Sequence, residues 1–333
     1  MEISIDFTRP PNKREREKYE RRLQRLERPG FVEDVEKIAG SFPGTLPATG
    51  LTLRHGFSYR DKGISADASD RKAPPPEMRP PATRLITSRG GALRFELTLI
   101  AVAQANRKAG ARARLKDLPI ESVGNSTRLG WTDLLSADAV DTKKRDAYIT
   151  AREKRARSVR SALNSLEAAG LVVIAEREGA RGRYDSLLLL NESGRDALGE
   201  VEEYRVPRAA EATFTLPEGF VSNGWLHVLE DSEIALLLMV ACGKGGFPDG
   251  GLLAMDSQTR LRHYGIHRDS FSAARKTLEW FGLLQVEELN RHDDGRAEEA
   301  DLRVHRLGLI RDGFDEAAPQ IVVDTLRRQL ARR

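Results

Sequence analysis

The chain contains an internal repeat of nineteen residues. The segment from Ser158 to Glu176, S-V-R-S-A-L-N-S-L-E-A-A-G-L-V-V-I-A-E, returns 112 positions later as S-F-S-A-A-R-K-T-L-E-W-F-G-L-L-Q-V-E-E, and seven aligned residues are identical. A glycine followed by a leucine, Gly170 and Leu171 in the first copy, falls at the same place in both copies. Glycine often follows the last helical turn because it adopts a left-handed backbone without strain. Each copy therefore predicts a helix that ends at this glycine and continues into a strand.

The residues around the second copy predict a small unit of three helices and two strands. An apolar run that starts at Asp231 is the first helix, and a glycine-rich loop follows it over 243–251. A short helix over 255–265 leads into the helix of the repeat, whose apolar side chains recur at helical spacing: Phe271, Ala274, Leu278 and Phe281. The unit closes with two strands and a last amphipathic helix, expected at 283–288, 301–306 and 320–333.

The first copy has the same order of elements over a longer stretch. A helix is expected over 92–105, and a polar stretch containing W-T-D-L-L should supply the middle helix. The residues from Thr142 to Ala169 form one long helix-compatible run, which Gly170 ends. A β-branched strand, L-V-V-I-A-E, follows and is joined by a Gly-Arg turn to a returning strand over 187–190.

Three helices, a strand, a hairpin and a second strand form the order of a winged helix. We therefore expect a mainly α protein with small β-hairpin wings, an α+β fold. Two tandem winged-helix domains should occupy 90–205 and 206–333, and the second should include the C-terminal helix.

The residues before these domains are expected to form a basic helical extension over 1–39 and a Gly/Pro-rich linker over 40–89. From Arg9 to Arg28 there are nine Lys or Arg residues against four Glu, and Tyr19, Leu23 and Leu26 fall on one helical face. The segment is either a solvated surface helix or a basic arm that lies against nucleic acid or a partner. The linker ends in R-K-A-P-P-P-E-M-R-P-P, which should not enter a helix or a sheet interior.

The third helix of a winged helix enters the major groove, and the wing reaches a neighbouring phosphate or minor groove. In the second unit the buried stripe leaves four side chains facing outward: Arg268, Ser272, Arg275 and Lys276. The repeat places four others near the equivalent face of the first unit: Arg157, Arg160, Ser161 and Asn164. The approach to that helix and its wing add Lys143, Lys144, Arg145, Arg152, Lys154, Arg155, Arg177, Arg181 and Arg183. Arg260, in the short helix of the second unit, completes the predicted DNA-binding set.

These side chains have the chemistry for DNA, since arginine can bridge guanine O6 and N7 and lysine neutralises phosphate. The alternative is an ordinary solvated basic face. The second wing differs, because residues 287–301 carry seven acidic residues against two arginines. Phosphate would repel such a hairpin. We therefore expect the first domain to be the stronger DNA-binding candidate.

Signals for catalysis and for metal or cofactor binding are weak. A single cysteine, Cys242, excludes an intrachain disulfide and a Cys-rich zinc site. The six histidines include no H-E-x-x-H motif, and G-K-G-G at 243–246 lacks the rest of a phosphate-binding loop. No nucleophile with a nearby base is recognisable. We predict no enzyme activity, no cofactor and no metal.

Composition indicates the cellular environment and the class of partner. No apolar run approaches the roughly 18 residues that cross a bilayer, and the N-terminus lacks the features of a secretory signal. We expect a cytoplasmic protein, associated with the nucleoid or a plasmid and with no membrane partner. The net charge of +4 and the pI near 9.2 lean mildly towards an anionic partner.

Tandem winged helices with a closing helix resemble the dual winged-helix replication initiators of plasmids, over about residues 90–330. The resemblance is architectural, and it implies that both domains bind the DNA of one repeat through the outward-facing residues given above. It also implies that one domain can support dimerisation or repress the initiator's own promoter. The acidic second wing and the basic N-terminal extension depart from that family.

The sequence thus favours a sequence-specific double-stranded DNA-binding protein, a replication initiator or transcriptional regulator of a plasmid or mobile element. A homodimer or a partner protein could engage the second domain. The competing hypothesis is a winged-helix adaptor that mediates protein assembly.

Overall fold

The protein consists mainly of helices with small antiparallel sheets, in agreement with the predicted fold class. The computed structural model describes residues 10–64, 72–115, 118–121, 129–135, 139–144, 147–174, 184, 187–194, 202–287 and 306–332. The α-helices are α1 (Lys13–Leu26), α2 (Phe31–Gly40), α3 (His55–Ser58), α4 (Pro81–Leu85), α5 (Ala92–Gln104), α6 (Ala151–Ala168), α7 (Gly219–Ser222), α8 (Trp225–Val228), α9 (Asp231–Cys242), α10 (Ser257–Tyr264), α11 (Arg268–Trp280) and α12 (Ala318–Ala331). Short 3-10 turns are η1 (Pro76–Met78), η2 (Arg89–Gly91), η3 (Trp131–Asp133) and η5 (Arg311–Phe314).

In the part of the chain that the structure describes, the strands form four antiparallel sheets. They are β1 (Leu51–Arg54), β2 (Thr142–Lys144), β3 (Ala147–Ile149), β4 (Val172–Ile174), β5 (Leu187–Leu189), β6 (Thr213–Leu216), β7 (Phe247–Asp249), β8 (Leu252–Ala254), β9 (Leu284–Glu287) and β10 (Arg306–Leu309). Three sheets are pairs, β1 with β6, β2 with β3 and β4 with β5, and the fourth has the order β7-β8-β10-β9.

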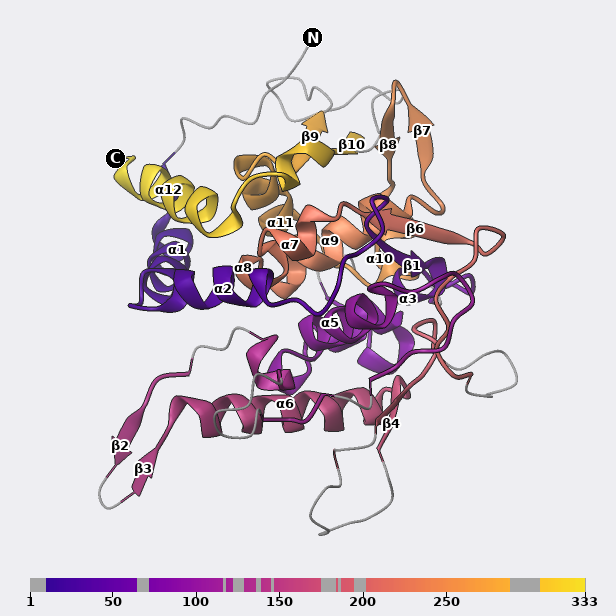
Figure 1. The fold of residues 1–333 in the computed structure, drawn as a ribbon. Helices are drawn as coiled ribbons and strands as arrows, with labels where there is room; N and C mark the ends of the chain where they lie inside the picture. Colours follow the sequence, from indigo (N-terminus) through magenta and orange to yellow (C-terminus); the bar gives the residue numbers. More distant parts are fainter. Residues whose placement is uncertain are drawn as a thin grey trace.

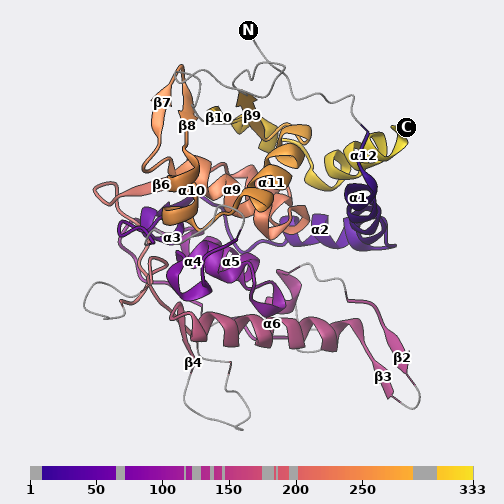
Figure 2. The same ribbon diagram turned by 180° about the vertical axis from the view of Figure 1, so that it is seen from behind.

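Two apolar helices, α5 and α9, form the centre of the molecule. Both are buried along almost their whole length, as expected for helices that are apolar on nearly every face. In both views α6 lies on one side of α5, and α11 and α12 lie towards the opposite end (Figure 1, Figure 2). The two copies of the repeat are thus on the outside of a shared core.

Both copies form the predicted helix, glycine stop and strand. Gly170 ends α6 and Gly282 ends α11, each with φ of +73°. The amide of the next residue, Leu171 or Leu283, donates to the carbonyl five residues back at 2.9 and 3.0 Å. This is the Schellman arrangement, in which glycine avoids the strain of a left-handed backbone.

The equivalence extends to the returning strands. The amide of Leu190 donates to the carbonyl of Leu171 at 2.9 Å, and the amide of Ile310 donates to that of Leu283 at 3.0 Å. The predicted buried stripe of α11 is also confirmed, since Phe271, Ala274, Leu278 and Phe281 are all buried. The predicted first wing over 177–184, apart from Tyr184, and the predicted second hairpin over 290–296 lie outside the described residues.

Three predicted segments have a different structure. The start of the long helical run is the hairpin β2–β3, because the side chain of Thr150 caps α6 and fixes its start at Ala151. Where the middle helix was expected near W-T-D-L-L, the described residues 129–135 form the turn η3. The loop after α9 forms the hairpin β7–β8, which extends the sheet of β9 and β10.

The region expected to be a linker contributes to the core. Leu51 and Leu53 of β1 are fully buried, and β1 pairs with β6 along its whole length. The prolines do not prevent helix formation either. Pro81 is the first residue of α4, where its missing N–H would have no helical acceptor.

The N-terminal helix α1 is also part of the fold. Tyr19 and Leu26 of its predicted apolar face are buried and Leu23 is partly buried, with α12 packed alongside. The Tyr19 ring meets the Trp280 ring of α11 edge-on, with 5.6 Å between centroids. The predicted apolar face of α1 is therefore packed against the body of the protein, while a contact of its exposed face with nucleic acid or a partner stays a prediction.

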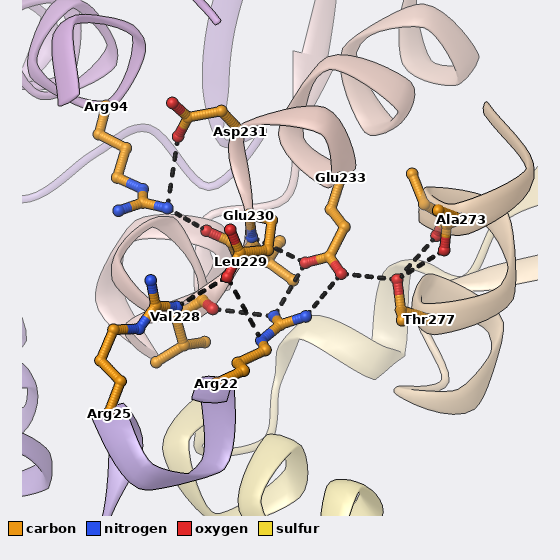
Figure 3. Close-up of polar contacts among 11 residues, drawn as sticks. Arg22, Arg25, Arg94, Val228, Leu229, Glu230, Asp231, Glu233, Ala273 and Thr277 are labelled. Carbon is orange, nitrogen blue, oxygen red and sulfur yellow. Dashed lines mark hydrogen bonds and ion pairs between the residues drawn. The ribbon is translucent and has the colours of Figure 1, made fainter. Parts of the chain in front are cut away.

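A buried polar network fixes α1 to the centre of the molecule (Figure 3). The Arg22 guanidinium donates to both carboxylate oxygens of Glu233 at 2.7 and 2.9 Å, and to the Val228 carbonyl at 2.9 Å. The side chains of Arg22 and Glu233 are each only 2% exposed. The Thr277 hydroxyl of α11 donates to the same carboxylate at 2.6 Å, so one ion pair joins α1, α9 and α11.

Replacing Arg22 by methionine should lower the free energy of unfolding by about 3–5 kcal/mol, because it leaves the Glu233 carboxylate buried without a cation. Urea denaturation at neutral pH measures the change. The matched control is Arg21→Met on the exposed side of α1, which should change stability by no more than about 0.5 kcal/mol. Similar losses in both variants would contradict a special role for the buried pair.

A second buried carboxyl group has no partner. Glu96 of α5 is fully buried, and neither of its oxygens has a hydrogen-bond partner among the described residues. Burial raises the pKa of Glu96 well above its usual value of 4.5, and the nearby charge of Glu192 raises it further. Glu192 is buried too, but its carboxylate forms an ion pair with Arg54, with 2.8 Å between Oε2 and Nη1. Glu96 is therefore the protonated member of this neighbourhood.

The Glu96→Gln variant should lose less stability than the wild type as pH rises from 4.5 to 7. Below the unfolded-state pKa of Glu96, the folded and unfolded chains both bind the proton. Above it, the unfolded chain releases the proton while the folded chain keeps it, so the free energy of unfolding of the wild type falls as pH rises. Urea denaturation at the two pH values tests this, with Glu20→Gln on exposed α1 surface as control. Equal losses in the wild type and Glu96→Gln would disprove it.

Candidate nucleic-acid interface

The inner face of α6 is held against the core, which determines the side chains that point outward. Ala156, Val159, Leu163 and Leu166 are buried on this face. The turn η2 packs directly on the helix backbone: a Cβ added to Gly90 would lie 2.4 Å from the carbonyl oxygen of Ser158.

The opposite face of α6 carries a basic stripe. Arg152, Arg157, Arg160 and Asn164 are all exposed, at spacings that place them on one side of the helix. In both views the hairpin β2–β3 projects beyond the N-terminal end of α6, and β4 leaves its C-terminal end on the same side, away from α5 (Figure 1, Figure 2). The helix is thus presented at the edge of the molecule between two strand pairs.

One acidic residue, Glu121, partly neutralises the stripe. Its two carboxylate oxygens lie 3.4 Å from Nε of Arg152 and 3.2 Å from Nη2 of Arg160. Arg157, between them, makes no ion pair within the described residues. Asn164 accepts a hydrogen bond from the Tyr184 hydroxyl at 3.1 Å. Arg157 is therefore the most available cation of the stripe.

The β2–β3 hairpin is a feature that the sequence analysis missed. Asp141 accepts the Ala151 amide at 2.6 Å and the Tyr148 hydroxyl, and this hydroxyl lowers the pKa of the Asp141 carboxyl. Lys154 donates to the Val140 carbonyl at 2.5 Å. Lys154 thus holds the hairpin to α6 and does not extend freely towards solvent. The strand-forming run A-Y-I-T after R-D was the available signal.

The hairpin also presents side chains of its own. Lys143 is exposed, and Tyr148 is 60% exposed. Lys144 lies in β2. Four predicted residues lie outside the described part of the chain: Arg145, Arg177, Arg181 and Arg183.

Besides Lys154, two predicted residues of α6 do not join the stripe. Arg155 is directed to Asp34 of α2, with which it forms an ion pair, and only 24% of its side chain is exposed. Ser161 lies beside η2: a Cβ added to Gly90 would be 3.1 Å from the Cβ of Ser161. Both positions are turned towards the body of the protein.

The equivalent face of α11 is partly covered by α1. Lys276 forms a 2.9 Å ion pair with Glu15, and its ammonium lies 5.0 Å from the centroid of the Trp280 ring. Arg275 is partly buried and, with Ser272, Lys276 and residues of α1, lines a groove of about 350 Å³. Arg268 and Ser272 remain exposed near the start of α11. Three of the four predicted outward residues, Ser272, Arg275 and Lys276, thus line the groove beside α1.

Arg260 does not face outward. It is only 6% exposed, and its Nε donates to the Ile266 carbonyl at 3.1 Å. Its guanidinium carbon lies 4.5 Å from the centroid of the Phe271 ring. Arg260 therefore joins α10 to α11, and its prediction as a DNA contact is wrong.

The comparisons with known proteins found no matching family model, curated protein or solved structure. Within the described ranges no helix has the length and apolar character needed to span a membrane. Over the same ranges no group of three or more His, Cys, Asp and Glu side chains could hold a metal ion. Cys242 is buried.

Replacing Gly90 by alanine should destabilise the protein more than replacing Gly91. Both have positive φ, which costs an alanine roughly 1–2 kcal/mol. Only Gly90 has the backbone of α6 within contact distance, whereas a Cβ on Gly91 meets nothing within 4 Å. Thermal unfolding of the two variants measures the difference. Equal shifts in unfolding temperature would mean that the η2 contact does not fix α6.

Proposed function

We propose that this protein is a sequence-specific double-stranded DNA-binding protein whose main contact is α6 together with its flanking strand pairs. The observation that carries the proposal is the exposed stripe of Arg152, Arg157, Arg160 and Asn164, presented at the edge of the molecule. The proposal assigns the unit of α5, α6, β4 and β5 to the winged-helix class. It is supported by the identical helix stops and strand pairings in the two copies.

The chemistry of the stripe suits a major groove. An arginine such as Arg157 can donate two hydrogen bonds to guanine, and Asn164 can pair with adenine. The hairpin β2–β3, with exposed Lys143 and Tyr148, would reach the phosphates at one side of the groove.

The two copies would have unequal roles. Contact with α1 removes part of the α11 face, so the first copy would supply most of the DNA affinity. A plasmid or mobile-element replication initiator or transcriptional regulator fits this arrangement, because it needs one specific duplex contact and a second surface for assembly.

The adaptor alternative is favoured by one observation in the second copy. Phe247 lies on the edge strand β7 and is 72% exposed, which is uncommon for a large aromatic side chain. Such an edge could pair with a partner protein. An adaptor would show little affinity for random duplex DNA and no steep dependence on salt.

Replacing Arg157 and Arg160 together by alanine should lower affinity for duplex DNA by at least about tenfold at moderate salt, since each lost contact costs about 1–3 kcal/mol. Fluorescence anisotropy with a duplex selected from a random library measures the affinity. The salt slope should become shallower as phosphate contacts are removed.

Two control variants test whether the effect is specific to the α6 stripe. Arg268→Ala with Ser272→Ala, at exposed positions of the second copy, should reduce affinity less than the α6 variant. Glu121→Gln should increase affinity, because it removes the carboxylate that pairs with Arg152 and Arg160. Unchanged binding by the Arg157 and Arg160 variant would remove α6 from the interface.

A further inference from the structure

A cavity of about 230 Å³ lies on the inner side of α6, between α1, α2, α5 and α8. Its lining is basic and contains no acidic residue. The residues that matter for its chemistry are Arg25, Gly90, Gly91, Arg94, Arg155 and His227. They come from four separate helices (α1, α5, α6 and α8) and the turn before α5, so folding assembles the site.

The N-terminus of α5 opens at this cavity. Gly91 occupies the capping position with φ of +68°, provides no side-chain cap, and no acidic residue lies in the first turn. The partial positive charge of a helix N-terminus is normally offset by a capping oxygen or an acidic side chain. Here the chain itself supplies neither.

His227 gives an independent indication of a ligand. Its side chain lines the cavity and is only 4% exposed, yet its Nδ1 has no hydrogen-bond partner in the described part of the chain. Buried polar atoms are rarely left without partners. Burial and the charge of Arg94 lower the pKa of His227 to about 3, so the imidazole is neutral and keeps one N–H to donate.

The arginines retain donors that their ion pairs do not use. Arg94 donates through Nη2 to the Leu229 carbonyl at 2.6 Å and lies 3.3 Å from Asp231 (Figure 3). Arg155 uses Nη2 for Asp34. The Nε atoms of Arg94 and Arg155 are buried and without a partner among the described residues.

We propose that this cavity binds a small ligand through a phosphate group, held by the α5 N-terminus, Arg94, Arg155 and His227. Phosphate accepts several hydrogen bonds at once, which matches a helix N-terminus beside arginine donors. The phosphate group in the cavity would not belong to bound DNA. The cavity residue Arg155 and the proposed DNA contact Arg157 are separated by about 200° of rotation around α6, so they face nearly opposite sides of the helix. The ligand would join α6 to α5 and α8, and its binding does not depend on the proposed DNA contact.

Isothermal titration calorimetry of the full chain with inorganic phosphate, and separately with AMP, tests the proposal at constant ionic strength. Saturable binding of either probe with a millimolar or lower Kd supports it, and tighter binding of AMP identifies a phosphate monoester as the ligand. Arg155→Gln should weaken binding at least tenfold, whereas Arg157→Gln on the opposite face should leave it unchanged. Equal losses in both variants would indicate non-specific charge attraction and overturn the assignment.

A measurement on the wild type covers the case in which Arg155→Gln fails to fold. Phosphate should shift the imidazole NMR signals of His227, identified with His227→Gln, and leave those of His263 on α10 in place. If neither probe binds saturably and the His227 signals do not move, the cavity is not a phosphate site. Duplex DNA that shifts the same signals in the absence of phosphate would also overturn the choice of a small ligand.

Discussion

The buried ion pair between Arg22 and Glu233 determines how the rest of the chain is arranged. Glu230, Asp231 and Glu233 crowd the N-terminus of α9 in the centre of the molecule. A helix N-terminus favours negative charge, but carboxylates removed from water need cations as well. The cations come from α1 and α5, which are distant in sequence. The N-terminal helix is therefore required to complete the core, although its composition resembles a detachable basic arm.

This requirement explains why two equivalent units have different surfaces. When α1 reaches α9 it must pass across α11, and contacts such as Tyr19 with Trp280 and Glu15 with Lys276 follow from that path. Within the described residues α5 and η2 pack on the inner side of α6, and neither view shows a described helix across its outer side (Figure 1, Figure 2). The surfaces of the two copies thus differ for two reasons. Their own residues differ, and α1 packs on α11, whereas no described helix packs on the outer side of α6.

The sequence was sufficient to predict those helices and strands that are determined by residues close to one another in the chain. The helix stops at Gly170 and Gly282 and the strands after them follow from neighbouring residues, and the structure has both. It did not predict β1, because its partner β6 lies more than 150 residues away and proline content dominated the local pattern. The role of Arg260 was missed for a similar reason: an arginine on an otherwise polar helix looks exposed until the ring of Phe271 is placed beneath it. For the candidate site, α6 was predictable and the acidic partner of its arginines was not.

Counting charges along a segment consequently overstates the charge that a ligand would meet. Arg22 and Arg25 belong to a strongly basic stretch of the chain, yet both form ion pairs with carboxylates at the N-terminus of α9. On α6, Glu121 takes up two of the outward arginines and leaves Arg157 without an ion pair in the described residues. A surface whose cations are mostly paired binds polyanions weakly in general, because few counterions are released. If α6 enters a groove, discrimination between sequences must come from a few positioned donors, and the paired arginines would engage only when DNA competes successfully with Glu121.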